Sequence, residues 1–238
     1  MHDLDALDPV YVAQVLSKPP FVTVPGVINV RDLGLLPSAT YPGKMTKPRY
    51  LYRSAEISGV LPEGKKLFKE LNITTVFDLR SDTEIRKYNS PLPEIDGVEI
   101  VHIPVFKTED YSPEMMAKRF QLYASGKTER EARVLTGYKL AGVDDETIAK
   151  DYSLTRVGRE PAREMIMARL SKEPLFQSNN EAALNMFTCR HDTMIAFLKL
   201  LQDKYHGVEA YVKKYVGFND EDIATVRDNI LVSSKSCL

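Results

Sequence analysis

Short apolar runs separated by glycine and proline mark the first half of the chain. They cover residues 27–30, 49–53, 74–79 and 98–105. Each run is rich in β-branched or aromatic residues, and the last one alternates before it becomes continuously apolar, which is typical of buried or half-buried strands. The sequence therefore predicts four strands before residue 110.

One amphipathic helix is expected between the second and third of these strands. Leu67, Phe68 and Leu71 fall on one helical face, Pro62 stands near the start, and Asn72 occupies the position of a left-handed C-terminal cap. A strand, a helix and a strand in this order predict a βαβ unit, and with it a parallel sheet with a right-handed crossover.

The second half of the chain follows a helical pattern instead. Asp144, Asp192 and Asn219 are the expected N-terminal caps, the last with Asp222 three residues on, and Gly217 is an expected stop. Helices are expected over 129–140, from Asp144 through Tyr152, from Pro161 through Leu170, over 193–201 and 208–215, and from Asn219 onward.

Strands first and helices afterwards predict an α/β fold in which a short, mostly parallel sheet is flanked by helices. We expect one domain over residues 1–238, with a strand-rich half at 1–110 and a helical half at 111–238.

Composition narrows the classes of partner. Lysine and arginine together number 32 and aspartate and glutamate 33, so no global field attracts nucleic acid or an anionic membrane. No apolar run approaches the length of a membrane span, and no residue spacing suggests a metal or a cofactor. Two cysteines give no disulfide framework, which favours a reducing, cytoplasmic location.

Several motifs together give the chain a family resemblance over roughly residues 21 to 231. It resembles a family of atypical tyrosine phosphatases of bacteria and fungi, some of which also act on phosphoinositides. The motifs are Gly26-Val27-Ile28-Asn29-Val30-Arg31-Asp32-Leu33-Gly34, Tyr52-Arg53-Ser54-Ala55, Phe77-Asp78-Leu79-Arg80-Ser81 with Glu84, Lys139-Leu140-Ala141-Gly142-Val143-Asp144-Asp145-Glu146, and Asp151-Tyr152. The resemblance implies a phosphatase-like fold and a phosphorylated protein or phosphoinositide as substrate.

The loop that carries this family's chemistry has no counterpart here. Its form is His-Cys-x-x-Gly-Lys-Asp-Arg-Thr-Gly, in which the cysteine thiolate attacks phosphorus and the arginine holds the phosphoryl oxygens. Cys189 is followed six positions on by Ile195, and Cys237 only by Leu238. Sliding the loop onto Gly126-Lys127 places Tyr123 at the nucleophile and Glu129 at the arginine. We interpret the interval as a lost segment that held the loop and the last central strand.

The remaining candidate site residues follow from the resemblance. Asp78 ends an apolar strand and is expected to be a general acid or a support for the loop, or else to cap the turn that follows it. The other side chains are expected to support a phosphate pocket directly or through ion pairs beneath it: Arg31, Asp32, Arg53, Ser54, Arg80 and Lys127.

Three functions remain open at this stage. The first is a phosphatase-family protein that does not hydrolyse its ligand because it lacks the nucleophile. The second is an incomplete form of a working tyrosine or lipid phosphatase. The third is an interaction module whose helical half binds a partner. Loss of a central strand would also leave the segment Val98–Val105 at a sheet edge, where it would promote aggregation.

Overall fold

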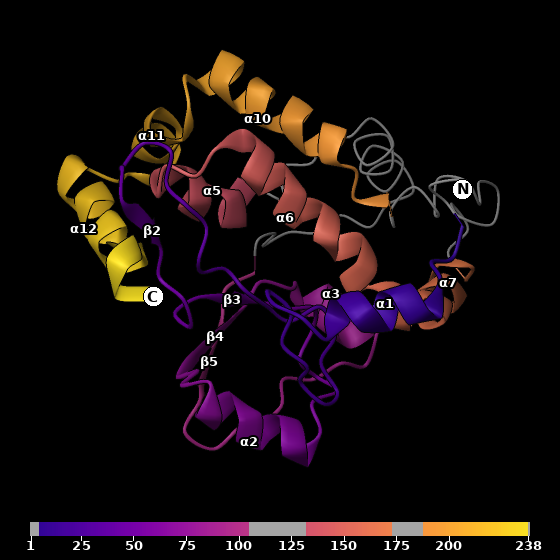
Figure 1. Cartoon of the computed structure of the whole chain (residues 1–238). Coiled ribbons are helices and arrows are strands. Elements are labelled where there is room, and N and C mark those ends of the chain that lie inside the picture. The colour runs from indigo at the N-terminus through magenta and orange to yellow at the C-terminus, as the bar shows by residue number, and fades with distance from the viewer. Residues whose placement is uncertain (1–4, 105–131, 173–187, 238) are drawn as a thin grey trace.

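The computed structural model describes residues 5–104, 132–172 and 188–237 (Figure 1). The strands are β1 (Arg31–Asp32), β2 (Lys44–Thr46), β3 (Tyr52–Arg53), β4 (Thr75–Asp78), β5 (Glu99–His102) and β6 (Leu231–Ser233). The α-helices are α1 (Pro9–Leu16), α2 (Pro62–Glu70), α3 (Asp82–Lys87), α5 (Ala132–Leu140), α6 (Asp145–Gly158), α7 (Arg163–Leu170), α10 (His191–Tyr205), α11 (Val208–Tyr211) and α12 (Asp220–Ile230). Short 3₁₀ turns lie at Glu160–Ala162 and Ser234–Cys237, and a π-helical turn, Val212–Val216, continues α11.

The α/β class is confirmed, but the strands pair differently from the expected βαβ unit. The parallel pair is β4 with β5, in which Thr75 lies opposite Glu99 and Asp78 opposite His102. The helix α3, not α2, lies between these two strands along the chain. The strand β3 pairs with β1 in antiparallel register, and β2 with β6. The order of elements along a chain does not determine which strands pair. Here the backbone N–H and C=O groups of β3 pair with those of β1.

Most helix boundaries follow from the caps that the sequence offers. The Asp144 carboxylate accepts a hydrogen bond from the Thr147 backbone N–H at 2.8 Å and begins α6. Asn219 and Asp222 form a reciprocal capping box at the start of α12. The expectation for Asp192 is wrong, because α10 begins at His191 and its N-cap is Arg190. Asp192 lies in the first turn, where its negative charge interacts favourably with the positive end of the helix dipole.

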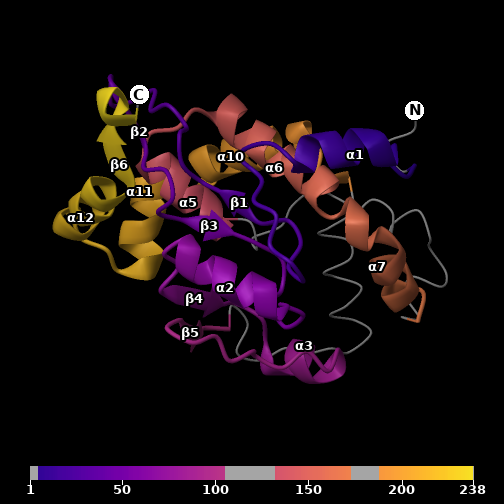
Figure 2. The same cartoon turned by 60° about the horizontal axis from the view of Figure 1, so that its bottom comes forward.

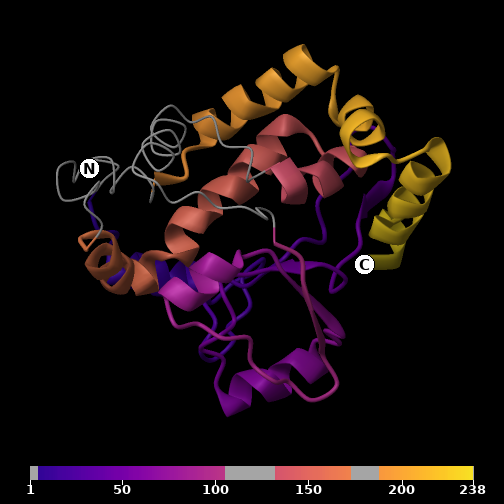
Figure 3. The same cartoon turned by 180° about the vertical axis from the view of Figure 1, so that it is seen from behind.

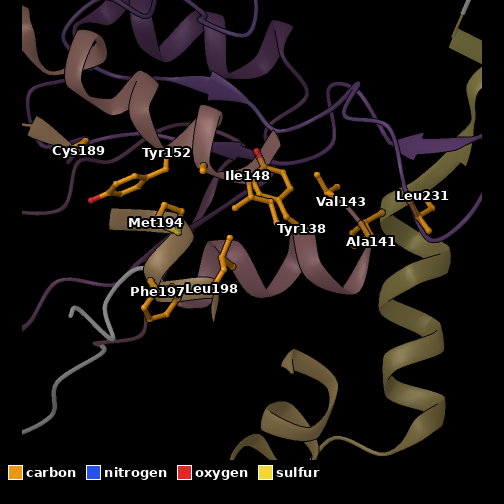
Figure 4. Close-up of a cluster of buried hydrophobic side chains, with 12 residues drawn as sticks. Tyr138, Ala141, Val143, Ile148, Tyr152, Cys189, Met194, Phe197, Leu198 and Leu231 are labelled. Carbon is orange, nitrogen blue, oxygen red and sulfur yellow. The ribbon is translucent and has the colours of Figure 1, made fainter. Parts of the chain in front are cut away.

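Three apolar clusters hold these elements together. The first joins α5, α6 and α10, and its buried side chains include Tyr138, Ile148 and Met194 (Figure 4). The second packs α2 against the β4–β5 pair through Phe68, with Val76 partly buried against it (Figure 2). The third joins α5, α10, α11 and α12 around Leu140, Leu201, Val208, Val212 and Ile223. The strand pair and α2 thus lie on one side of the molecule and the helical clusters on the other (Figure 3).

The expected boundary near residue 110 falls outside the described residues. Within the described ranges, no helix combines the length and the apolar character that crossing a bilayer requires.

Candidate functional site

The carboxyl end of β4 carries a cluster of charged side chains that we call the β4-end cluster, made of Glu56, Asp78, Arg80, Ser90 and His102. Arg80 is its centre. Its Nε lies 3.0 Å from both carboxylate oxygens of Asp78, and its Nη2 lies 2.6 Å from Asp78 Oδ2. Arg80 Nη1 donates to Glu56 Oε2 at 3.0 Å and to the Ser90 hydroxyl at 2.9 Å. The guanidinium of Arg80 is therefore held on several sides by oxygen acceptors.

The electrostatics of this pair fix the protonation state of Asp78. Burial by itself raises the pKa of the Asp78 carboxyl, but hydrogen bonds and charge from Arg80 outweigh it, so that the pKa lies below its usual value. Burial likewise lowers the pKa of Arg80, and Asp78 with Glu56 more than restores it. Asp78 is consequently ionised at neutral pH and has no proton to donate.

His102 ties the end of β5 to the same cluster. Its Nε2 lies 2.7 Å from the backbone carbonyl oxygen of Arg80, and its Nδ1 lies 3.8 Å from Asp82 Oδ1. A hydrogen bond from the ring nitrogen to this carbonyl fixes the backbone at Arg80. His102 therefore supports the loop that follows β4.

A second cluster, the Arg31–Asp151 cluster, joins β1 and β3 to α6. Arg31 has no exposed side-chain surface, and its Nε lies 3.2 Å from Asp151 Oδ1. Its other nitrogens donate to Asn29 Oδ1, to the Asp151 carbonyl and, at 3.0 Å, to the Thr155 hydroxyl. Burial lowers the pKa of Arg31, and Asp151 acts against that effect. Three acceptors besides the carboxylate thus compensate the desolvation of this cation.

Arg53 and Tyr138 lie at the border of this cluster. Arg53 Nη1 is 3.7 Å from Asp151 Oδ2, which is too long for a hydrogen bond, and 23% of the Arg53 side chain is exposed. The Tyr138 hydroxyl and Asp151 Oδ2 are buried side-chain atoms with no hydrogen-bond partner among the residues that the structure describes. Burial, followed by the charge of Asp151, raises the pKa of Tyr138, so its phenol stays neutral.

The two clusters adjoin through the residues after β3. Arg53 belongs to one and Glu56 to the other, and three residues of chain span at most about 11 Å. Glu56 also accepts from Arg169 Nη1 of α7 at 3.4 Å, and the Arg169 guanidinium lies over the Tyr88 ring. The ends of β3 and β4 and the helices α6 and α7 therefore converge on one region that carries four arginines.

The other expected pocket residues have local roles or lie outside the described ranges. Asp32 accepts hydrogen bonds from the backbone N–H groups of Gly34 at 2.9 Å and Arg49 at 2.8 Å. Ser54 is exposed, and its hydroxyl donates to the Ala55 carbonyl at 2.7 Å. Lys127 lies outside the described residues.

Sequence reasoning missed several members of both clusters. Asp151 lies in the Asp151-Tyr152 motif but is not among the site residues that the sequence predicts, although it is the counter-ion of Arg31. Glu56, Ser90 and Arg169 belonged to no motif, and nothing in the sequence connected them with Arg80. Each meets its partner only through the fold.

Neither cysteine belongs to the β4-end cluster or to the Arg31–Asp151 cluster. Cys189 is 8% exposed and packs in the first apolar cluster, directly before α10. Cys237 ends the final 3₁₀ turn, which follows β6. In the part of the chain that the structure describes, no group of three or more His, Cys, Asp and Glu side chains could hold a metal ion.

Comparison with known proteins gives one positive result. The family model described as the tyrosine phosphatase family matches residues 22–138 and 132–232, which together span most of the chain. The two matched segments overlap over residues 132–138, which lie within α5. A search among curated proteins found no match.

Proposed function

Because the chain belongs to the tyrosine phosphatase family, we propose that it recognises phosphomonoester groups with that family's scaffold but does not hydrolyse them. Family membership supports a phosphatase-like fold and a phosphorylated ligand. The proposal that the chain does not hydrolyse phosphomonoesters rests on its sequence, since no cysteine in the 238 residues precedes an arginine by six positions. Without the thiolate no covalent phosphoenzyme can form.

Arg53 is the residue that we propose as the anion ligand in the described region. The Arg31 guanidinium is fully buried and bonded to four acceptor atoms, and that of Arg80 is engaged by Asp78, Glu56 and Ser90. Within the described ranges, the guanidinium of Arg53 has one ion-pair contact, at 3.7 Å with Asp151, and is partly exposed. Of Arg31, Arg53 and Arg80, Arg53 therefore has the guanidinium whose hydrogen-bond donors are most available to a phosphoryl group.

We propose that Asp78 supports the loop after β4 rather than acting as a general acid. Its carboxylate binds both the backbone N–H and the side chain of Arg80. Its lowered pKa leaves it ionised over the range in which a general acid must hold a proton.

The two free cysteines also support the proposal of a reducing, cytoplasmic location.

The test is a turnover assay on the purified chain with a chromogenic aryl phosphate, and with a short-chain phosphoinositide as the second substrate. We expect no hydrolysis above the buffer blank for either one. Turnover that vanadate inhibits and that survives Cys189→Ser would overturn the inactive assignment. Phosphate binding is measured separately by calorimetry, with Arg53→Gln expected to weaken it and Arg49→Gln as the control.

A second candidate function has one observation in its favour. The family match comes in two segments that meet beside the interval in which the loop is lacking. This arrangement supports an incomplete form of a working tyrosine or lipid phosphatase. Reading the genomic interval between the codons for Gly126 and Val134 decides it. An in-frame stretch encoding His-Cys-x-x-Gly-Lys-x-Arg establishes this candidate, and its absence removes it.

A further inference from the structure

Two buried side-chain atoms of the Arg31–Asp151 cluster have unused hydrogen-bonding capacity. Among the residues that the structure describes, neither the Tyr138 hydroxyl nor Asp151 Oδ2 has a hydrogen-bond partner. Tyr138 is 3% exposed and Asp151 is 6% exposed. Buried polar groups nearly always have a partner, and leaving one unpaired costs free energy. A phenol that can donate and a carboxylate oxygen that can only accept therefore suit a ligand that offers both an acceptor and a donor.

Both atoms lie in the neighbourhood of Arg53. Asp151 uses Oδ1 for Arg31 Nε at 3.2 Å, and its Oδ2 lies 3.7 Å from Arg53 Nη1. The ring of Tyr138 packs in the first apolar cluster (Figure 4). Burial and then the charge of Asp151 raise the pKa of Tyr138, while the charges of Arg53 and Arg31 lower it. We call the Arg53 guanidinium, Asp151 Oδ2 and the Tyr138 hydroxyl the Arg53 site.

Arg53 connects this site with solvent. The exposed fraction of its side chain is 23%, whereas Arg31 has no exposed side-chain surface. A ligand that arrives from solvent therefore meets the Arg53 guanidinium first. A ligand oxygen bound to Nη1 then shares that nitrogen with Asp151 Oδ2, so the chemistry of the site depends on whether a proton lies between the two oxygens.

The other charged groups around the site are engaged elsewhere. Asp32 of β1 accepts hydrogen bonds from two backbone N–H groups. The helix α10 packs on α6 and contributes His191, which binds Glu146 at the exposed start of α6. At the other end of α6, Arg156 binds Glu160. The helix α1 also packs on α6, and its segment Pro9–Leu16 contains no charged residue.

We propose that the Arg53 site takes the protonated, singly charged form of a phosphomonoester, an inference that rests on the proposed function. Arg53 donates to one phosphoryl oxygen and the Tyr138 hydroxyl to a second, while the P–OH group donates to Asp151 Oδ2. The doubly charged form has no proton to give, so its oxygen and the carboxylate oxygen would repel each other. A sulfate ester carries the same single charge without a proton and is rejected for the same reason.

The first test is calorimetric binding of phenyl phosphate to the unaltered chain at several pH values. A phosphomonoester loses its second proton with a pKa of about 6. The affinity is expected to be highest below this pH and to fall by about tenfold per pH unit above it. Phenylphosphonate has a higher second pKa and is expected to lose affinity at a correspondingly higher pH. This difference between the two ligands assigns the titration to the ligand and not to a side chain of the protein.

A matched ligand and a matched variant test the other two contacts. Phenyl sulfate is expected to bind more weakly than singly charged phenyl phosphate by on the order of tenfold or more. Tyr138→Phe is expected to weaken phenyl phosphate binding by on the order of tenfold without lowering the thermal midpoint, because it removes a hydroxyl that the fold leaves unpaired. The control is Tyr52→Phe, since neighbouring residues of a strand point to opposite faces and Tyr52 directly precedes Arg53 in β3.

The outcomes separate this inference from the proposed function. No binding of phenyl phosphate at any pH would remove the proposed function and this inference with it. Three results would overturn the protonated form alone and leave phosphate recognition by Arg53 in place. They are an affinity for phenyl phosphate that rises with pH, equal affinities for phenyl sulfate and phenyl phosphate, or an unchanged affinity in Tyr138→Phe.

Discussion

At the scale of single residues, the buried ion pair between Arg31 and Asp151 is the most costly feature of the structure to disturb. Arg31 is completely buried and Asp151 is 6% exposed. A pair of this kind contributes little net stability over an apolar pair, but removing one partner leaves an uncompensated charge in the interior. The pair also joins β1 to α6, so its loss affects both halves of the fold.

Asp151→Asn is therefore predicted to lower the free energy of unfolding by about 3 kcal/mol or more. Urea unfolding followed by circular dichroism measures the change. The control is Asp145→Asn at the start of α6, whose exposed pair with Lys139 is worth at most about 1 kcal/mol. Similar losses in the two variants would mean that Arg31 does not depend on Asp151.

Asp78 gives the structure a pH dependence of known sign. Its pKa is lower in the folded chain than in the unfolded one, where it is about 3.9. The stability that it contributes is therefore fully present above about pH 4 and is lost as the pH falls through the folded pKa.

The predicted measurement is the free energy of unfolding of the unaltered chain and of Asp78→Asn from neutral to acid pH. The variant is expected to be the less stable of the two at neutral pH, and the gap is expected to close as the pH falls below about 4. A gap that stays constant down to acid pH would show that the Asp78 charge is not what stabilises the end of β4.

At the scale of elements, two helical glycines offer a matched comparison. A Cβ at Gly137 in α5 would meet no atom within 4 Å, whereas at Gly158 in α6 it would collide with the Asn29 side chain. Asn29 in turn binds Arg31. The space around each glycine therefore decides the sign of its substitution.

Gly137→Ala is predicted to stabilise the chain by about 0.5–1 kcal/mol, because alanine loses less backbone freedom in a helix. Gly158→Ala is predicted to destabilise it, because Asn29 must move away from Arg31. Thermal and urea midpoints of both variants test the pair, and a destabilising Gly137→Ala would contradict the packing described for α5.

Local chemistry made several helix boundaries predictable, but the expected strand over 27–30 is only an isolated bridge at Val27. Asp144 before α6 and the Asn219–Asp222 box mark boundaries through the hydrogen bonds they make, and Pro62 marks the start of α2 because it has no backbone N–H to leave unpaired and its φ suits the first helical turn. The missed boundary, at α10, is one where a suitable cap residue lies inside the helix instead. The helix α1 went unpredicted although Asp8 caps it, because its apolar face covers a short segment only.

At the scale of the whole molecule, the contacts that build the site could not be predicted. Asp151 is 120 positions from Arg31, and Arg169 is 113 positions from Glu56. A charged residue has many possible partners of opposite sign, and only packing selects among them. The sequence could indicate Asp78, Arg80 and Arg53 as candidate site residues. It could not indicate which of them has its hydrogen-bonding groups already occupied by other residues.

The β4–β5 pair leaves one apolar face open. Phe77 is 60% exposed and Ile103 44%, while Val76 and Ile100 pack on the second apolar cluster. Parallel strands are normally covered on both faces. The edge hazard expected for Val98–Val105 stays a prediction, since Val105 lies outside the described residues, and the exposed Phe77 adds a separate apolar contact surface on the sheet face.

Phe77→Thr is predicted to reduce self-association without lowering the free energy of unfolding. Sedimentation velocity over a range of concentrations measures the first quantity and urea unfolding the second. The control Phe68→Thr, which changes a side chain 4% exposed, is expected to destabilise the chain by about 3 kcal/mol. Unchanged association in Phe77→Thr would place the contact elsewhere.

The central claim is that this phosphatase-family scaffold cannot accept a phosphoryl group covalently. Intact-mass spectrometry after incubation with an aryl phosphate and an acid quench tests it most directly. The account predicts that the mass of the chain does not change. A mass increase of one phosphoryl group, mapped by peptide sequencing to any side chain of this protein, would contradict it.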